Sequence, residues 1–293
     1  MKMTSETTLG GRTFQVEVLS LPAPDKDQDA WRVCDGFVAV ADGATPLRDE
    51  PSMVVREYAE AALDELDARR GEPASRMVRA AIEATKHVAS SQSPPLSSTV
   101  ALARTVSEGI QIVVLGDCTV VVADTHGRRR TIRDRRLTRI DGEVSEKLAR
   151  LTGAGVSLEH ANKAIAGDLI ANRSRMNRPD SYWSFSNELT ASRHILHRLY
   201  SPQSVSAMLI CSDGFARLSD TFAVVAGMTD LLERCQRDGL VGLGRELRSL
   251  EQAPNSLMRY PRLDRYDDAT AILLIASGTP GAPSRNLDSP VQR

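Results

Sequence analysis

Cysteine and histidine are scarce in this sequence, and neither is grouped as in a metal or disulfide cluster. The 293 residues include five histidines and four cysteines. The cysteines lie far apart, at Cys34, Cys118, Cys211 and Cys235. Because no CxxC pair is present, we expect reduced core cysteines in a cytosolic protein rather than a disulfide framework. His194 and His197 are three residues apart in a segment expected to be helical, but zinc would need two further ligands, which favours surface histidines.

Long apolar runs and an excess of charge of one sign are also absent. No apolar stretch of about 18 residues and no N-terminal apolar segment occurs, so we expect neither a membrane span nor a secretory leader. The 37 Lys and Arg residues nearly balance the 38 Asp and Glu residues, for a formal net charge of −1. Such a balance creates no overall field that would attract nucleic acid or an acidic membrane. We therefore expect neither of these partners.

Strand-like and helix-like segments occur in blocks along the chain. Alternating or β-branched segments predict strands, and apolar residues at helical spacing predict helices. The predicted strands cover residues 14–21, 30–34, 37–41, 98–105, 109–115, 118–123, 205–211 and 269–275. The predicted helices cover residues 53–69, 74–89 and parts of 148–198 and 221–250. Short turns separate the strands between residues 98 and 123, so we expect these strands to form an antiparallel meander.

The order of these blocks indicates the fold class. Strands, two helices, a block of strands, an insertion, a strand, helices and a last strand form an α+β arrangement, in which helices pack on antiparallel sheets. A length of 293 residues is within reach of one large domain, which we expect to cover residues 1–275. Residues 276–293 carry too little apolar surface to fold and are predicted to be a disordered tail.

An Asp-Gly dipeptide lies at each end of the apolar run from Phe37 to Ala41. Asp35-Gly36 separates two strand-like segments, which is the pattern of a tight hairpin. Asp42-Gly43 is followed by a proline-containing segment with no returning strand. We therefore interpret Asp42 as a carboxylate at the open end of a buried strand. An aspartate where a buried strand meets a loop recurs at Gly116-Asp117, Asp213-Gly214 and Asp267-Asp268.

Strand-end aspartates of this kind predict a shared acidic pocket. Carboxylates that are brought together raise one another's pKa and lower stability unless a cation neutralises them. Oxygen ligands select Mg²⁺, Mn²⁺ or Ca²⁺ rather than zinc. Two such ions about 3.5–4 Å apart generate a nucleophilic hydroxide and hold a phosphoryl group for in-line attack. Each aspartate has a simpler alternative as a capping or turn residue. Asp117 could close a hairpin, and Asp268 is expected to bind solvent or a hydrogen-bond donor.

Five short motifs follow one another in the order VADGA, SSTVAL, VLGDCTVVV, LICSDG and DDATAILL. Together they resemble the signature motifs of the metal-dependent protein phosphatases of type 2C, from about residue 28 to residue 275. The resemblance implies a central β-sandwich of two antiparallel sheets flanked by helices, with a variable flap at about residues 124–204. It also implies a binuclear Mn²⁺ or Mg²⁺ centre at one end of the sandwich.

The resemblance implies a role for each matching residue of the metal centre. Asp42 would bridge two metal ions, and the carbonyl of Gly43 would ligate one of them. Asp213 and Asp267 would complete the centre. Asp117 matches a position that helps to bind a third ion in bacterial members.

Two further matches lie beside the metal ligands. Asp29 matches a carboxylate that holds metal-bound water, so Asp29, Asp42 and Asp213 are the expected catalytic aspartates. Ser98-Thr99 lies in the family's glycine-serine-threonine strand and is expected to be structural.

Three positions depart from the family pattern, and one of them is Ser97, which stands where the glycine of the strand motif is usual. The family has a phosphate-binding arginine five residues before the Asp29 position, where this chain has Pro24. Ala44 stands where some relatives carry a histidine that is proposed to protonate the leaving group. A metal-bound water or a substrate with a good leaving group would have to suffice. The residues that could replace the missing arginine are Lys26, Arg173, Arg175 and Arg178.

Two basic segments have both a functional and a structural interpretation. Arg128 to Arg136 could bind a phosphopeptide or nucleic acid, but we favour a solvated turn between two strands. The segment NRSRMNRPDSYWSF, residues 172–185, lies where the family has its flap. It either contacts the substrate or serves only as a loop.

The expected function is the metal-dependent hydrolysis of phosphoserine and phosphothreonine in proteins. A metal-bridging hydroxide would be the nucleophile, without a covalent phosphoenzyme. Two alternatives stay open. One is a non-catalytic module on the same fold that binds phosphoproteins or another partner, which Pro24 and Ala44 favour. The other is a phosphatase of a small phosphoester.

Overall fold

A computed structural model of the chain describes residues 1–44, 52–91 and 94–278. It contains two antiparallel sheets, one of six strands and one of five. The six-stranded sheet has the order β1 (Lys2–Leu9), β2 (Arg12–Leu21), β11 (Ala269–Ala276), β10 (Val205–Cys211), β7 (Thr119–Asp124) and β8 (Arg129–Ile132). The five-stranded sheet has the order β3 (Ala30–Cys34), β4 (Phe37–Gly43), β5 (Ser98–Val106), β6 (Gly109–Leu115) and β9 (Leu196–Tyr200).

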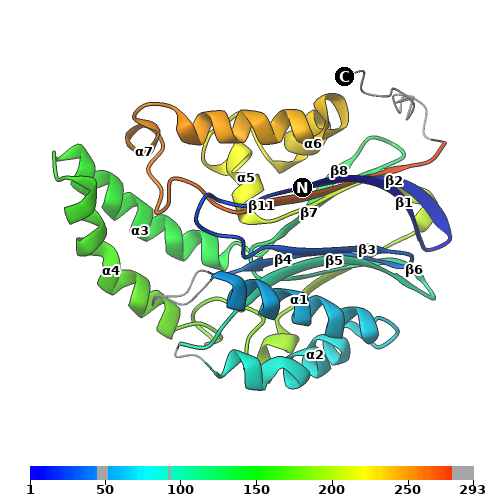
Figure 1. Ribbon diagram of the computed structural model, residues 1–293. Coiled ribbons are helices and arrows are strands. Elements are labelled where there is room, and N and C mark those ends of the chain that lie inside the picture. The colour runs from blue at the N-terminus through cyan, green and yellow to red at the C-terminus, as the bar shows by residue number, and fades with distance from the viewer. Residues whose placement is uncertain (45–51, 92–93, 279–293) are drawn as a thin grey trace, which may run out of the picture.

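Helices cover the outer faces of both sheets and one end of the sandwich (Figure 1). The helices are α1 (Ser52–Ala68), α2 (Ala74–Ala89), α3 (Arg136–Gly153), α4 (Leu158–Ser174), α5 (Asp213–Asp220), α6 (Met228–Gln252) and α7 (Ser256–Arg259). Helices α1 and α2 cover the five-stranded sheet, α5 and α6 cover the six-stranded sheet, and α3 and α4 project at one end. This arrangement confirms the predicted α+β class with a central β-sandwich. Among the helices that the structure describes, none combines the length and apolar character that a membrane crossing requires.

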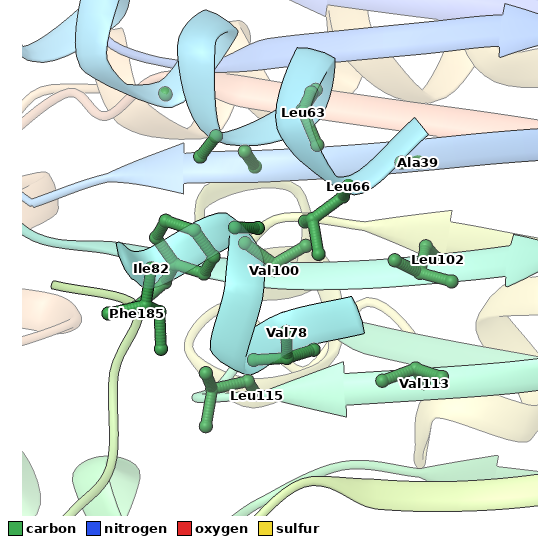
Figure 2. Packing of buried hydrophobic residues seen from close by; sticks show 14 of the residues in the cluster. Ala39, Leu63, Leu66, Val78, Ile82, Val100, Leu102, Val113, Leu115 and Phe185 are labelled. Carbon is green, nitrogen blue, oxygen red and sulfur yellow. The ribbon is translucent and has the colours of Figure 1, made fainter. Parts of the chain in front are cut away.

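The central strands are buried on both faces, which explains their continuous apolar sequences. In β4, Val38 and Val40 point between the sheets, whereas Ala39 and Ala41 point toward α1 and α2. Figure 2 shows the outer of these two layers, where side chains of α1 and α2 lie over β5 and β6. The labelled helix residues are Leu63, Leu66, Val78 and Ile82, and the strand residues beneath them are Val100, Leu102, Val113 and Leu115. Packing on both faces fixes the register of the strands and therefore the position of their ends.

Most predicted elements are present with ends shifted by a few residues. The hairpin at Asp35-Gly36 is confirmed, because β3 and β4 pair antiparallel on either side of it. The sequence patterns missed β1, whose side chains are mostly polar. As an edge strand that pairs only with β2, β1 needs fewer apolar residues than a central strand. The predicted tail begins at Ala276, the last residue of β11, and residues 279–293 lie outside the described part of the chain.

The predicted three-strand meander is wrong at its last strand. Strands β5 and β6 pair antiparallel, but β7 pairs with β10 in the other sheet. The chain crosses between the sheets at Gly116-Asp117, which is therefore not a hairpin turn. Gly116 has a φ of +90°, and a Cβ atom there would lie 2.4 Å from the side chain of Thr99. The crossing carries Asp117 to the end of the sandwich.

Two local predictions in the insertion are also wrong. The segment from Arg128 to Arg136 is not a turn, because it contains the edge strand β8 and its last residue begins α3. His194 and His197 do not share a helix. His194 follows a short 3₁₀ helix and stacks on Trp183 with 3.6 Å between ring centroids, whereas His197 lies in β9.

Replacing Gly116 by alanine tests the close passage between the sheets. Both the positive φ and the contact with Thr99 oppose a side chain, so we expect Gly116→Ala to lower the free energy of unfolding by about 2–4 kcal/mol. Gly127→Ala is the matched control, since Gly127 has a φ of +79° but a Cβ atom there would have no neighbouring atom within 4 Å. It should cost only about 1 kcal/mol. If urea unfolding showed the same loss in the free energy of unfolding for Gly116→Ala and Gly127→Ala, a packing role for Gly116 would be contradicted.

Candidate functional site

A cavity of about 780 Å³ opens at the end of the sandwich. Four predicted aspartates line it, at Asp42, Asp117, Asp213 and Asp267, together with Gly43. They come from both sheets. Asp42 lies in β4, Asp117 follows β6, Asp213 follows β10, and Asp267 precedes β11. Since β10 and β11 are antiparallel neighbours, the end of one lies beside the start of the other. Sheet stacking then brings all four aspartates to the same end.

Asp42 and Asp213 are in direct contact across the two sheets. The backbone N–H of Asp213, at the start of α5, donates to the Oδ2 atom of Asp42 at 3.3 Å. The N-terminus of a helix favours nearby negative charge, which helps to hold these carboxylates. Gly43 packs closely as well, because a Cβ atom there would lie 2.5 Å from the carbonyl oxygen of Gln28. The sequence beside Asp29 is thus held against the end of β4.

Asp29 is buried beside this group. Its side chain is 1% exposed, and within the described residues neither carboxylate oxygen has a hydrogen-bond partner. Burial and the charges of Asp268 and Asp267 raise its pKa, although the hydroxyls of Thr270 and Ser212 lie near enough to oppose the shift. A buried carboxylate without a partner is unfavourable unless it binds a proton or another ligand.

Asp267 and its neighbour Asp268 have different surroundings. Asp267 accepts a hydrogen bond from Arg217 at 2.5 Å between Nη2 and Oδ2. Asp268 accepts from the backbone N–H groups of Ala23 and Gln28, each at 2.7 Å. Asp268 is therefore a hydrogen-bonding residue that ties the segment before β3 to β11, as expected from the sequence.

The electrostatics of the cavity are those of crowded carboxylates. Burial, and then the charges of Asp213 and Asp141, raise the pKa of Asp117 to about 7. Burial also raises the pKa of Asp267 to about 7, against the opposing charge of Arg217. The pKa of Asp42 rises through burial and the charges of Asp213, Asp29 and Asp117. Each charge disfavours the ionised form of the others.

The donor set fits a hard divalent cation. It consists of carboxylate oxygens and accumulates negative charge. The buried carboxylate of Asp29, which has no hydrogen-bond partner among the described residues, lies near enough to raise the pKa of Asp42. Among the described residues, however, no three His, Cys, Asp or Glu side chains are already arranged around one point as ligands. Asp267 is paired with Arg217 instead. A cation that binds the Oδ2 atom of Asp267 would compete with Arg217 for that atom.

Helices α3 and α4 form another wall of the cavity and add residues that the sequence patterns did not single out. Asp141 of α3 lines the cavity, as do Arg133 and Arg217. Arg217 lies four residues after Asp213, and recognition of α5 as a helix would have placed both on one face. Asp141 lay outside the helices predicted from sequence, because α3 begins 12 residues before the predicted segment at residue 148.

Of the four residues that could replace the arginine missing at Pro24, the structure places only Arg173 in the lining of the cavity. Lys26 is paired with Asp264 at 2.6 Å. Arg175 donates to the carbonyl of Asp180 at 3.0 Å and does not line the cavity, nor does Arg178. Arg173 of α4 lines the cavity, and its Nη1 atom donates to the Oγ atom of Ser97 at 3.0 Å. Ala44 lines the cavity too but offers no proton donor.

The stacked sheets, the outer helices and the aspartates at one end define a class of protein. A sequence profile of the family described as protein phosphatase 2C matches residues 23–250. The match covers more than half of the chain, so the chain belongs to the protein phosphatase 2C family. A comparison with curated protein sequences gave no match.

Several solved structures share the fold. The chain is similar to RsbX, solved in complex with magnesium, at 14% identity and a TM-score of 0.50 over 94% of this chain and 100% of that one. It is similar to the Mycobacterium tuberculosis phosphatase PstP/Ppp at 16% identity and a TM-score of 0.51, over 89% and 98%. It also resembles Stp1 from Staphylococcus aureus at 16% identity and a TM-score of 0.52, over 92% and 98%. The two-sheet fold is therefore that of the family.

The raised pKa of Asp117 predicts how stability depends on pH in the metal-free protein. Asp117 is protonated up to about pH 7 in the folded state but only to about pH 4 when unfolded. Between these values the folded state binds more protons, so stability falls as pH rises. We therefore expect the free energy of unfolding to fall less steeply with pH in Asp117→Asn than in the wild-type protein. Urea unfolding of the two proteins in the presence of EDTA would measure this difference. The same pH dependence in both proteins would show that Asp117 ionises normally.

Proposed function

We propose that this protein hydrolyses phosphoserine and phosphothreonine in phosphoproteins with Mn²⁺ or Mg²⁺ as cofactor. The observation that carries the proposal is the gathering of Asp42, Asp117, Asp213 and Asp267 around one cavity in a member of the protein phosphatase 2C family. The cytosol is the proposed compartment, because all four cysteines are unpaired.

The proposed ligands are divided between the two sheets. Asp42, the carbonyl of Gly43, Asp213 and Asp267 would hold two ions, and Asp117 would help to hold a third. When bound, the ions supply a Lewis acid for the phosphoryl oxygens and an activated water. Bound ions would also remove the mutual repulsion that raises the pKa values of the carboxylates.

Asp29 would orient water at the centre. Its two carboxylate oxygens are buried and lack a hydrogen-bond partner in the described structure, so each can accept a hydrogen bond from a water molecule. Its charge raises the pKa of Asp42, which places the two carboxylates near each other. A carboxylate in this position holds water by accepting its protons.

Arg173 would bind the substrate phosphate. Its guanidinium lines the cavity close to Ser97, and its charge opposes the raised pKa values of Asp141 and Tyr182. A planar guanidinium donates two parallel hydrogen bonds to phosphate oxygens, which a lysine cannot do. The arginine would then reach the phosphate from the flap instead of from the segment that contains Pro24.

The first test compares the two Asp-Gly dipeptides. Asp42→Asn removes a proposed ligand, so we expect hydrolysis of p-nitrophenyl phosphate with Mn²⁺ to fall at least about 100-fold. Asp35→Asn is the matched control and should keep full activity, because asparagine is well accepted in a hairpin turn. EDTA should abolish the activity of the wild-type protein and of Asp35→Asn.

Other results would change the proposed function. Full activity of Asp42→Asn would refute the assignment of this residue. No turnover in the wild-type protein with any metal, combined with binding of a phosphopeptide, would support the non-catalytic module. Turnover of small phosphoesters but not of phosphopeptides would support the alternative substrate class.

A second test addresses the phosphate-binding residue. We expect Arg173→Ala to raise the KM for a phosphoserine peptide by about tenfold or more, since a charge-assisted bidentate interaction contributes roughly 1.5–3 kcal/mol. Arg175→Ala is the control on the same segment, because Arg175 is exposed, donates locally to the carbonyl of Asp180 and does not line the cavity. Steady-state kinetics with saturating Mn²⁺ would measure both variants. An unchanged KM in Arg173→Ala would exclude Arg173 from phosphate binding.

A further inference from the structure

One lateral edge of the sandwich is open in both sheets. Among the strands that the structure describes, β8 ends the six-stranded sheet and pairs only with β7, and β9 ends the five-stranded sheet and pairs only with β6. Across the sandwich, β1 contacts β3 and β7 contacts β6. The unpaired edges of β8 and β9 therefore lie on the same side of the molecule. Most residues of both strands are exposed.

Each of these two strands carries an arginine on its inner face. Arg130 of β8 lies opposite Val122 of β7, and Arg198 of β9 lies opposite Ile112 of β6. Val122 and Ile112 both belong to the apolar cluster between the sheets. Since residues that lie opposite each other share a face, both arginines are on the faces that the sheets turn toward each other. Burial raises the pKa of Tyr200, and the charges of both arginines oppose this rise, so both lie near one tyrosine.

The two arginines have no acidic partner. Within the part of the chain that the structure describes, neither Arg130 nor Arg198 forms an ion pair, and both are exposed. Arg198 donates to the carbonyl of its neighbour His197 at 3.5 Å. In contrast, Arg129 of β8 is paired with Glu233 of α6 at 3.2 Å. Two uncompensated like charges at one edge favour the binding of an anionic group.

Apolar side chains flank Arg198 on the edge strand. Leu196 is 37% exposed and Leu199 is 51% exposed. Because side chains alternate along a strand, Leu196 shares the face of Arg198 and Leu199 lies on the opposite face. A protected edge strand carries charge in place of such apolar surface. Here apolar surface, positive charge and an unpaired main chain occur together, which is the combination that the addition of an extended peptide requires.

We infer that β9 docks an extended segment of a partner protein, whose main chain pairs with the free edge of β9 and whose acidic side chain binds Arg130 and Arg198. Guanidinium groups form their strongest hydrogen bonds with carboxylates. A second copy of this chain does not suit the edge. If β9 paired antiparallel with itself about its central residue, two copies of Arg198 would lie opposite each other, and like charges in that position are destabilising.

The open edge leads to the cavity. Strand β8 ends at Ile132, immediately before Arg133, and β9 begins at Leu196, which pairs with Val114 shortly before Asp117. Arg133 and Asp117 line the cavity. A segment paired along β9 would therefore hold the rest of the partner beside the cavity, which suits a phosphoprotein substrate. Only this last step rests on the proposed function, because docking itself requires neither a metal ion nor turnover.

Peptide binding to the whole protein tests the charge of the site. The probe is a fluorescent peptide in which glutamate alternates with valine, and the same peptide with lysine in place of glutamate is its control. The double variant Arg130→Glu, Arg198→Glu should raise the dissociation constant of the glutamate peptide about tenfold or more and should bind the lysine peptide instead, because both charge pairs are reversed. Arg79→Glu, at an exposed position of α2, should behave as wild type. Fluorescence anisotropy would measure all four combinations.

Hydrogen exchange tests the added strand. The glutamate peptide should protect backbone amides of β9 in the wild-type protein, because they gain hydrogen-bond partners. Strand β3, the other edge of the same sheet, is the internal control and should be unaffected. A glutamate peptide with alternate backbone nitrogens methylated cannot pair as a strand, and we expect it to bind at least about tenfold more weakly.

The other outcomes would overturn the inference. Equal binding of the glutamate and lysine peptides, or equal weakening in Arg79→Glu, would show attraction without a specific site. No binding of either peptide would mean that the arginines only protect an edge strand from pairing. A dimer in sedimentation experiments that is lost in Leu199→Asp would assign the edge to a second copy of the chain. Each result is obtained without phosphatase activity and leaves the proposed function untouched.

Discussion

The repulsion among aspartates at one end of the sandwich is the constraint on which the rest of the structure depends. Burial, followed by the charges of Asp213, Asp29 and Asp117, raises the pKa of Asp42. Burial and then the charge of Asp213 also raise the pKa of Asp117. Strand packing opposes this repulsion, because the strands that carry the aspartates are buried on both faces by the apolar clusters. A flexible loop could move its carboxylate into solvent, whereas a strand end held in register cannot. The sandwich therefore maintains a concentration of negative charge that a divalent cation can neutralise.

Arginines supply part of the neutralising charge within the protein itself. Arg217 binds Asp267 and also lies 3.5 Å from Glu251, a fully buried acid that is paired with Arg248 as well. Arg133 pairs with Asp220 and lowers the pKa of Asp117. A cation and Arg217 would compete for the same carboxylate, so breaking the Arg217–Asp267 pair would oppose the proposed metal binding. Partly buried pairs of this kind contribute more than exposed ones, because solvent screens them less.

Helices α3 and α4 add further charged residues to the site at the end of the sandwich. The two helices pack around their own apolar cluster and place one acidic and one basic residue, Asp141 and Arg173, beside the aspartates. Opposite charges on this helix pair suit the proposed binding of a cation and an anionic phosphate at one site. The basic segment after α4 includes Arg175 and Arg178, which do not line the cavity, so the contribution of this region comes from α4 itself.

Sequence patterns alone predicted most of the strands and helices, the α+β class and the strand-end aspartates, since periodicity and Asp-Gly dipeptides are local properties of the chain. They missed the edge strands β1, β8 and β9. The sequence did not determine that β7 leaves the meander for the other sheet, because pairing of β7 with β10 depends on residues far apart in the sequence. Nor could the sequence place Asp141 in the same cavity as Asp213. It also could not show that Asp29 is buried with no hydrogen-bond partner for its carboxylate among the described residues. Burial and mutual charge arise only when distant segments are packed together, and for this reason the tertiary structure alone decided which carboxylates and arginines share the cavity.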